Sequence, residues 1–292
     1  CLQASSHQPL TQVSTRMMQR FSNTWSLMKS SFAVLQAEKK LLIFPVISAL
    51  VTLLILASFI FPTLVLDKGW IEDGIISDST RWYHYLQLFG LYYVCYFIML
   101  FFNSATVASA VYVMRGGKPT IGGAMNAVMS RLGPLAAWAL IAASIGLILN
   151  IIENQSDKIG KIITGLLGMS WTLISFMVLP ILIIENRGPV ESLKTSITML
   201  KGTWGEQILG HFSFGLIYFI LIMPMFVVLF LLMNLGEAAM LPAMVLAIVY
   251  SLAVAAVQWV LQSIYMGALY MYTRDHEIPD GFSVSQINTS IE

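Results

Sequence analysis

Polar side chains that interrupt otherwise apolar stretches are the first residues in this sequence that could do chemistry. The set consists of Asn103, Asn150, Gln258, Gln262 and Ser263. Gln258 and Gln262 are four positions apart, so on a helix they share one face. An amide surrounded by hydrocarbon must find a hydrogen-bonding partner, so we expect this face to contact other helices. Hydrogen bonds between helices are the simplest interpretation, and the lining of a substrate path is the alternative.

A second group is charged and follows two of the apolar stretches. Its members are Glu185, Arg187, Arg274, His276 and Glu277. A membrane enzyme would need acids and histidines gathered near one interface, and these residues could supply them only if two separate helix exits met in a cytoplasmic cluster. Separated loops usually do not meet in this way, so we expect that the protein is not an enzyme.

Other reactive groups are scattered. The histidines lie in four different segments, at His7, His84, His211 and His276. No two of them have the helical spacing of zinc ligands, and the two cysteines do not form a metal or disulfide pattern. No glycine-rich segment ends in the Lys-Ser or Lys-Thr pair of a phosphate-binding loop. We therefore expect no metal and no cofactor.

The apolar stretches that must position these residues are long. The chain has 292 residues, of which 57% are hydrophobic and 11% charged, whereas about 25% of residues are charged in a soluble domain. Uncharged runs cover residues 41–66, 82–114, 132–152, 162–184, 207–236 and 238–273. Because roughly 20 apolar residues cross a hydrocarbon core of about 30 Å, each run is long enough to span. We predict an all-α, polytopic membrane protein with six transmembrane helices.

Charge predicts the orientation of these helices. Twelve Lys and Arg residues fall in segments on one side of the predicted membrane and four on the other. The positive-inside rule then predicts that the protein crosses the cell inner membrane with both termini in the cytoplasm. The net charge is +1, and the basic residues are spread among loops, which excludes a nucleic-acid partner.

Amphipathic segments recur before the odd-numbered membrane helices. Three of them, at residues 18–35, 121–132 and 190–204, carry apolar residues at helical spacing. Pro119, Pro189 and Pro279 follow the second, fourth and sixth apolar runs. This pattern predicts about three cytoplasmic surface helices and three repeats of a surface helix plus a transmembrane hairpin.

Domain organisation follows from the same pattern. Residues 1–16 are polar and are expected to be a disordered or upstream extension. Residues 17–282 form a single six-helix membrane domain, and residues 283–292 form a cytoplasmic tail. Small residues four positions apart, such as Ser263 and Gly267, predict close contacts between helices within this domain.

Several segments resemble a known family. Three features resemble the bacterial and archaeal integral membrane proteins of domain of unknown function 6159. They are the spacing of six helices, the start of the first surface helix, and the run ENRGPVESLKTSITMLKGTWGEQILG, which begins at Glu185. More distantly they resemble membrane domains attached to some glycerophosphodiester phosphodiesterases. The resemblance covers residues 18 to about 282. It implies a fold and a membrane location, and it carries no catalytic motif.

Two functions fit these observations. The first is a non-enzymatic integral membrane protein of scaffold or partner-binding type, because every residue singled out has a structural interpretation. The second is a transporter or lipid-handling protein that uses the polar face of the sixth helix. The predicted spans lack carboxylates, which argues against ion-coupled transport. Membrane lipids are the expected partners, with another membrane protein or a second copy of the chain as candidate protein partners.

Overall fold

The regular structure is helical throughout the part of the chain that could be placed. The computed structural model describes residues 28–66, 81–233 and 237–275. After a helix at residues 28–37, the elements are η1 (Lys39–Leu42), α2 (Ile43–Leu66), α4 (Arg81–Met114), α5 (Ile121–Met129), α6 (Leu132–Gln155), α7 (Lys158–Ser175), α8 (Val178–Ile184), α9 (Pro189–Met233) and α10 (Glu237–Asp275). The predicted all-α fold class is confirmed.

Five helical segments among the described residues are long and apolar enough to cross a membrane. They are Lys39–Phe59, Leu86–Met114, Leu132–Gln155, Lys158–Ile184 and Leu241–Asp275. The remaining predicted span, at residues 207–236, contains the shorter apolar segment Phe214–Phe230 within α9. Many large apolar side chains on these helices are exposed, including Leu54 at 67% and Phe230 at 68%. A soluble protein would not expose so many, so the chain is a membrane protein.

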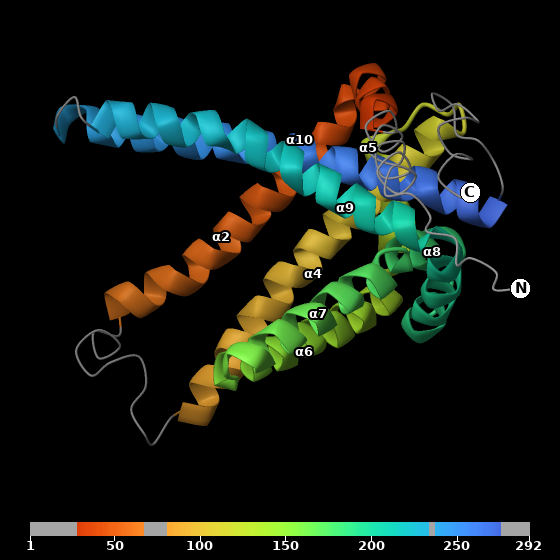
Figure 1. The fold of residues 1–292 in the computed structure, drawn as a ribbon, viewed down its shortest axis with the longest axis horizontal. Helices are drawn as coiled ribbons and strands as arrows, with labels where there is room; N and C mark the ends of the chain where they lie inside the picture. Colours follow the sequence, from red (N-terminus) through yellow and green to blue (C-terminus); the bar gives the residue numbers. More distant parts are fainter. Residues whose placement is uncertain (1–27, 67–80, 234–236, 276–292) are drawn as a thin grey trace, which may run out of the picture.

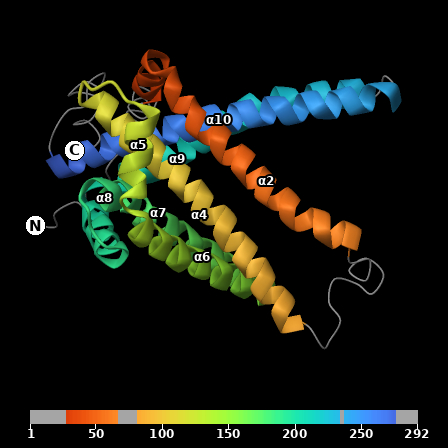
Figure 2. The same cartoon turned by 180° about the vertical axis from the view of Figure 1, so that it is seen from behind.

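The long helices are arranged in pairs. Contacts join α2 to α4, α6 to α7, and α9 to α10. Figure 1 shows the α6/α7 and α9/α10 pairs diverging from a common end, and the view from behind in Figure 2 shows the same divergence. Helix α4 contacts α2, α5, α6, α8 and α10, so it is the element on which the pairs assemble.

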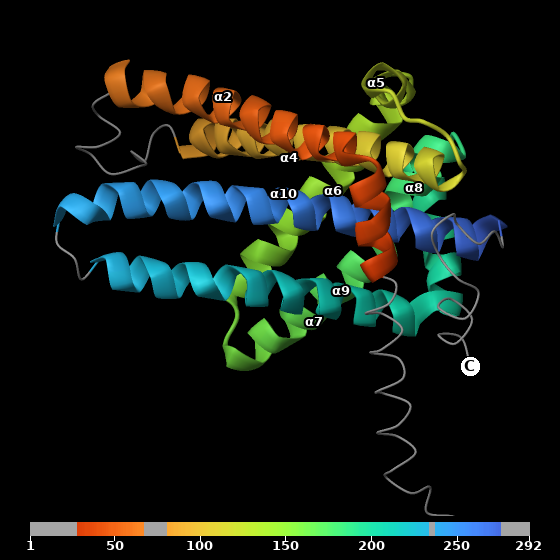
Figure 3. The same ribbon diagram turned by 90° about the horizontal axis from the view of Figure 1, so that it is seen from above.

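The predicted surface helices have different outcomes. Helix α5 is a separate short helix that buries Ala124 and Val128 and exposes Ile121 and Met129, as an amphipathic helix should. The segment predicted at residues 190–204 is not a separate helix but the beginning of the 45-residue α9. Figure 3 shows that the first turns of α9 run in a different direction from its long remainder. Residues 18–27 of the first predicted surface helix lie outside the described residues.

Two helix ends depend on residues with positive φ. Gly116 has φ 79° after α4; its N–H donates to the carbonyl of Val113, and the N–H of Gly117 donates to that of Tyr112. This is the Schellman pattern, which satisfies carbonyls at a helix end. Asn186 has φ 57° after α8, so asparagine ends that helix and Pro189 begins the next one.

The core lies where α4, α8 and α10 meet. Ala105, Ile181 and Ile264 are fully buried there. A Cβ atom added at Gly267 of α10 would lie 2.9 Å from Val111 Cγ2 and 3.0 Å from Met114 Cε, both on α4. The close approach of helices predicted at Ser263 and Gly267 is therefore present, and it fixes the register of α10 against α4.

Candidate functional site

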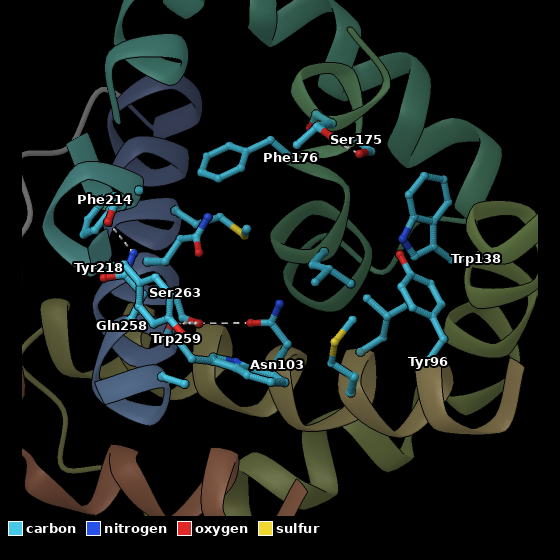
Figure 4. Close-up of a pocket in the computed structure, with 18 residues that line it drawn as sticks. Tyr96, Asn103, Trp138, Ser175, Phe176, Phe214, Tyr218, Gln258, Trp259 and Ser263 are labelled. Atoms are coloured by element: carbon cyan, nitrogen blue, oxygen red, sulfur yellow. Dashed lines mark hydrogen bonds between the residues drawn. The ribbon is translucent and has the colours of Figure 1, made fainter. Parts of the chain in front are cut away.

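A cavity of about 620 Å³ lies among α4, α6, α7, α8, α9 and α10. Figure 4 shows Asn103, Gln258, Trp259 and Ser263 on one side of it and Tyr96 and Trp138 on another. Some lining residues are exposed, among them Thr172 and Gly215. Its volume is within the range of small-molecule sites in proteins. The cavity is therefore the candidate binding site.

The predicted polar face forms part of this cavity. Asn103, Gln258, Gln262 and Ser263 all line it. The Ser263 hydroxyl lies 3.0 Å from Asn103 Oδ1, to which it donates, and 2.9 Å from the Trp259 carbonyl oxygen. Gln258 Nε2 donates to the Phe214 carbonyl oxygen over 2.9 Å. These bonds join α10 to α4 and to α9, so the predicted hydrogen bonds between helices are present, and the same face lines a cavity. The lining of a substrate path stays a prediction.

Asn150 is not part of this face. It is exposed near the far end of α6, where its Oδ1 accepts a hydrogen bond from Asn154 Nδ2 over 3.0 Å. Both asparagines belong to one helix, four positions apart, so the pair satisfies itself locally and joins no other element. The expectation that Asn150 belongs to the polar face is therefore corrected.

A polar hydrogen in the wall of the cavity has no partner. Trp259 Nε1 is buried and has no hydrogen-bond acceptor among the described residues. A buried donor left unsatisfied costs about 1–3 kcal/mol. Trp259 Nε1 is not exposed to the cavity. The other polar groups of the lining are hydroxyls, amides and the Trp138 indole, and none of the lining residues carries a formal charge. The site can therefore hydrogen-bond a neutral ligand through these groups and has no ion with which to balance a charged one.

A break between α7 and α8 shapes the opposite wall. Pro180 lacks an N–H and crowds the carbonyl four residues before it, which favours a break in the helix at Phe176 and Met177. Ser196 of α9 bridges the break: its hydroxyl donates to the Ile174 carbonyl oxygen over 2.6 Å and accepts from the Met177 N–H over 3.3 Å. Figure 4 shows Ser175 and Phe176 from this break at the edge of the cavity.

Replacing Ser196 with alanine is expected to lower the free energy of unfolding by about 1 kcal/mol, because two buried backbone groups lose their partner. Thermal unfolding in detergent measures the change. Ser170→Ala is the matched control, because Ser170 is exposed and bonds only the Leu166 carbonyl of its own helix. Equal midpoints for both variants would mean that Ser196 does not stabilise the break.

The charged cluster forms in part, contrary to expectation. Glu185 Oε1 lies 3.1 Å from Arg274 Nε and accepts from the Tyr270 hydroxyl over 3.2 Å. Glu185 Oε2 lies 2.7 Å from Arg187 Nε, an ion pair whose geometry makes no hydrogen bond to that oxygen. The separated exits do meet, because α8 packs against α4 and α10. His276 and Glu277 lie outside the described residues.

The charged cluster consists of ion pairs that join helix ends. Asp275 pairs with Arg115 over 2.7 Å, so α4, α8 and α10 are joined by charges at one end. Each acid has a basic partner, and no group of His, Cys, Asp and Glu that could hold a metal ion was found in the described ranges.

Sequence reasoning missed the aromatic part of the site. Trp138 stacks on Trp171 with ring centroids 5.8 Å apart, and Phe214 meets Tyr265 edge to face at 5.3 Å. Trp138 and Phe214 both line the cavity. Aromatic residues are common in membrane helices, so their types alone did not distinguish them. Pro180, by contrast, is visible in the sequence and could have predicted the break between α7 and α8.

Comparison with known proteins bears on the family alone. No curated protein and no solved structure matches the chain, so the more distant resemblance to phosphodiesterase membrane domains gains no support. One family model matches residues 83–280, which include α4 from its first turn, α5 to α9, and α10. That stretch also contains every described residue of the cavity and of the charged cluster. The chain belongs to the family described as Family of unknown function (DUF6159).

Proposed function

We propose that this protein binds a lipid-like molecule, with an uncharged polar group, in the cavity between α4 and the α9/α10 pair. The observation that carries the proposal is a cavity of about 620 Å³ whose lining combines the amides of Asn103, Gln258 and Gln262 with aromatic rings and has no charged residue. A ligand with an ester or ketone oxygen would accept from an amide of this lining. Its apolar part would lie against Trp138, Phe176 and Phe214.

The proposed ligand comes from the membrane. We propose six spans, with the Phe214–Phe230 segment of α9 as part of the fifth, in a cell inner membrane with both termini in the cytoplasm. The positive charge of the loops supports this orientation. Asn103 lies eleven residues before the end of α4, which corresponds to about 16 Å of helix. At that depth the cavity faces hydrocarbon, so a lipid-like molecule can enter it sideways between helices.

This proposal favours the lipid-handling function over the scaffold. A scaffold needs no cavity of this kind. The neutral lining also fits a neutral cargo better than an ion, since moving an ion through a membrane usually requires a charged partner.

The test uses native mass spectrometry of the protein extracted in mild detergent, with dioleoylglycerol added as the probe. We expect the wild type to retain one probe molecule and the Gln258→Leu/Gln262→Leu variant to bind it about tenfold more weakly, because the polar face no longer has its amides.

Asn150→Leu is the control, since it removes an amide from a membrane helix outside the cavity. Binding that is unchanged in the glutamine variant would contradict the proposal. A chain that retains no lipid, but copurifies with a second protein or as an oligomer, would favour the scaffold function.

A further inference from the structure

The cavity that contains the polar face of α10 is closed toward the charged helix ends. Ala110 of α4, Leu182 of α8 and Tyr270 of α10 lie one to two turns beyond the lining residues of their helices, and each is at most 1% exposed. Past them, Glu185 pairs with Arg274 over 3.1 Å. Packed side chains and then ion pairs therefore separate the cavity from this end of the molecule, so this end offers a ligand no way in.

The cavity is open at its side. Three of its lining residues are exposed, and they belong to three helices: Met99 of α4, Thr172 of α7 and Gly215 of α9. A residue that both lines a cavity and is exposed at the surface marks the mouth of that cavity. The α6/α7 and α9/α10 pairs diverge from their common end (Figure 1). The mouth therefore lies in the angle between the two pairs, where membrane hydrocarbon surrounds the helices.

The rim of this mouth is apolar. Met169 lies three positions before Thr172 and is 53% exposed. Phe219 lies four positions after Gly215 and is 57% exposed. Residues three or four apart share a helix face, so both side chains belong to the surface around the mouth. The Thr172 hydroxyl donates to the Gly168 carbonyl oxygen of its own helix over 2.9 Å. The rim therefore suits hydrocarbon chains better than a polar group.

The size of the cavity determines how much of a lipid it can hold. Its volume of about 620 Å³ suits a drug-sized ligand, and a lipid with two long acyl chains is larger than that. Gln258 and Gln262 belong to the lining, so a polar group finds its partners inside the cavity. Chains that remain in the bilayer lose no hydrophobic free energy, because lipid tails are as apolar as the leucine side chains of a helix.

We propose that the mouth at Met99, Thr172 and Gly215 holds the acyl chains of the bound lipid, which pass between α7 and α9 into the membrane while the polar group stays in the cavity. This inference rests on the proposed function, because it concerns the same ligand. It adds a dependence on chain length. A lipid with short chains fits inside the cavity, whereas one with long chains needs an open mouth.

The test compares two glycerides with the same polar group in native mass spectrometry. Dioleoylglycerol has long chains, and dihexanoylglycerol has chains short enough for the cavity. Gly215→Trp fills the mouth: a Cβ atom at Gly215 would meet nothing within 4 Å, so the added side chain need not disturb the fold. We expect this variant to retain dioleoylglycerol about tenfold more weakly than the wild type and dihexanoylglycerol within about twofold of it. Thr172→Trp, which narrows the mouth from α7, should show the same selectivity.

Gly133→Trp is the matched control, because Gly133 is an exposed glycine of α6 outside the cavity lining, and a Cβ atom there would also meet nothing within 4 Å. Equal weakening of both glycerides in the two mouth variants, or unchanged retention of dioleoylglycerol in them, would overturn the inference and leave the proposed function in place. A wild type that retains neither glyceride, or a Gln258→Leu/Gln262→Leu variant that retains both as the wild type does, would overturn the proposed function and the inference with it. Helical circular dichroism and a single elution peak confirm that each variant is folded.

Discussion

Replacing Gly267 with leucine is expected to lower the free energy of unfolding by about 3 kcal/mol, because overpacking at a close helix contact typically costs about 1–3 kcal/mol. Even the first added carbon would lie 2.9 Å from Val111 Cγ2 and 3.0 Å from Met114 Cε. Val111 and Met114 are 3% and 2% exposed, so neither can turn outward. Alanine adds only that carbon, and we expect it to cost about 1 kcal/mol.

Thermal unfolding in detergent, followed by size-exclusion chromatography of the heated sample, measures this effect. Gly90→Leu is the control: Gly90 is on α4, and a Cβ atom there would meet nothing within 4 Å. Its stability should stay within about 0.5 kcal/mol of the wild type. If Gly267→Leu and Gly90→Leu have the same midpoint of thermal unfolding, then α10 and α4 are not in contact at Gly267.

The same glycine illustrates what the sequence can predict. Ser263 and Gly267 are small residues four positions apart, and that spacing predicts a close contact. It does not identify the partner, because the spacing describes only one helix. Val111 and Met114 lie more than 150 positions earlier in the chain, and only the packing of α10 on α4 identifies them.

Hydropathy predicts the long helices well but not every boundary. Twenty apolar residues are enough to identify a span, so the described apolar helices coincide with predicted ones. Within α9, the charged residues Lys201 and Glu206 precede the apolar run at residues 207–236 without ending the helix. Lysine and glutamate are good helix formers, so a change in hydropathy there does not imply a break in the backbone.

The candidate site was predictable only in part, because the sequence shows which residues share a helix face but not which residues of other helices they meet. The shared face of Gln258 and Gln262 follows from helical periodicity, which is local. The partnership of Ser263 with Asn103 crosses 160 positions of sequence. The unpaired Trp259 N–H is a property of the assembled cavity, since nothing about a single tryptophan in a helix says whether its N–H will meet an acceptor.

Replacing Glu185 with glutamine is expected to lower the free energy of unfolding by about 2 kcal/mol. The Glu185 side chain is 11% exposed and lies between two guanidinium groups, Arg187 at 2.7 Å and Arg274 at 3.1 Å. Removal of its charge leaves both arginines facing each other across a neutral amide. They are 30% and 43% exposed, so water compensates for part of the loss, and the effect should be smaller than for a fully buried pair.

A double-mutant cycle separates this ion pair from general damage to the helix end. Glu185→Gln, Arg274→Gln and their combination should give a coupling energy of about 1 kcal/mol in thermal or denaturant unfolding, because the two residues are in contact. Glu191→Gln is the control: it also removes a partner of Arg187, but its side chain is 60% exposed, so we expect a change below about 0.5 kcal/mol. Additive single effects would mean that the ion pair of Glu185 with Arg274 does not contribute to stability. A positive coupling would instead mean that the ends of α8 and α10 are joined by charge, which holds the α10 wall of the cavity in place against α4.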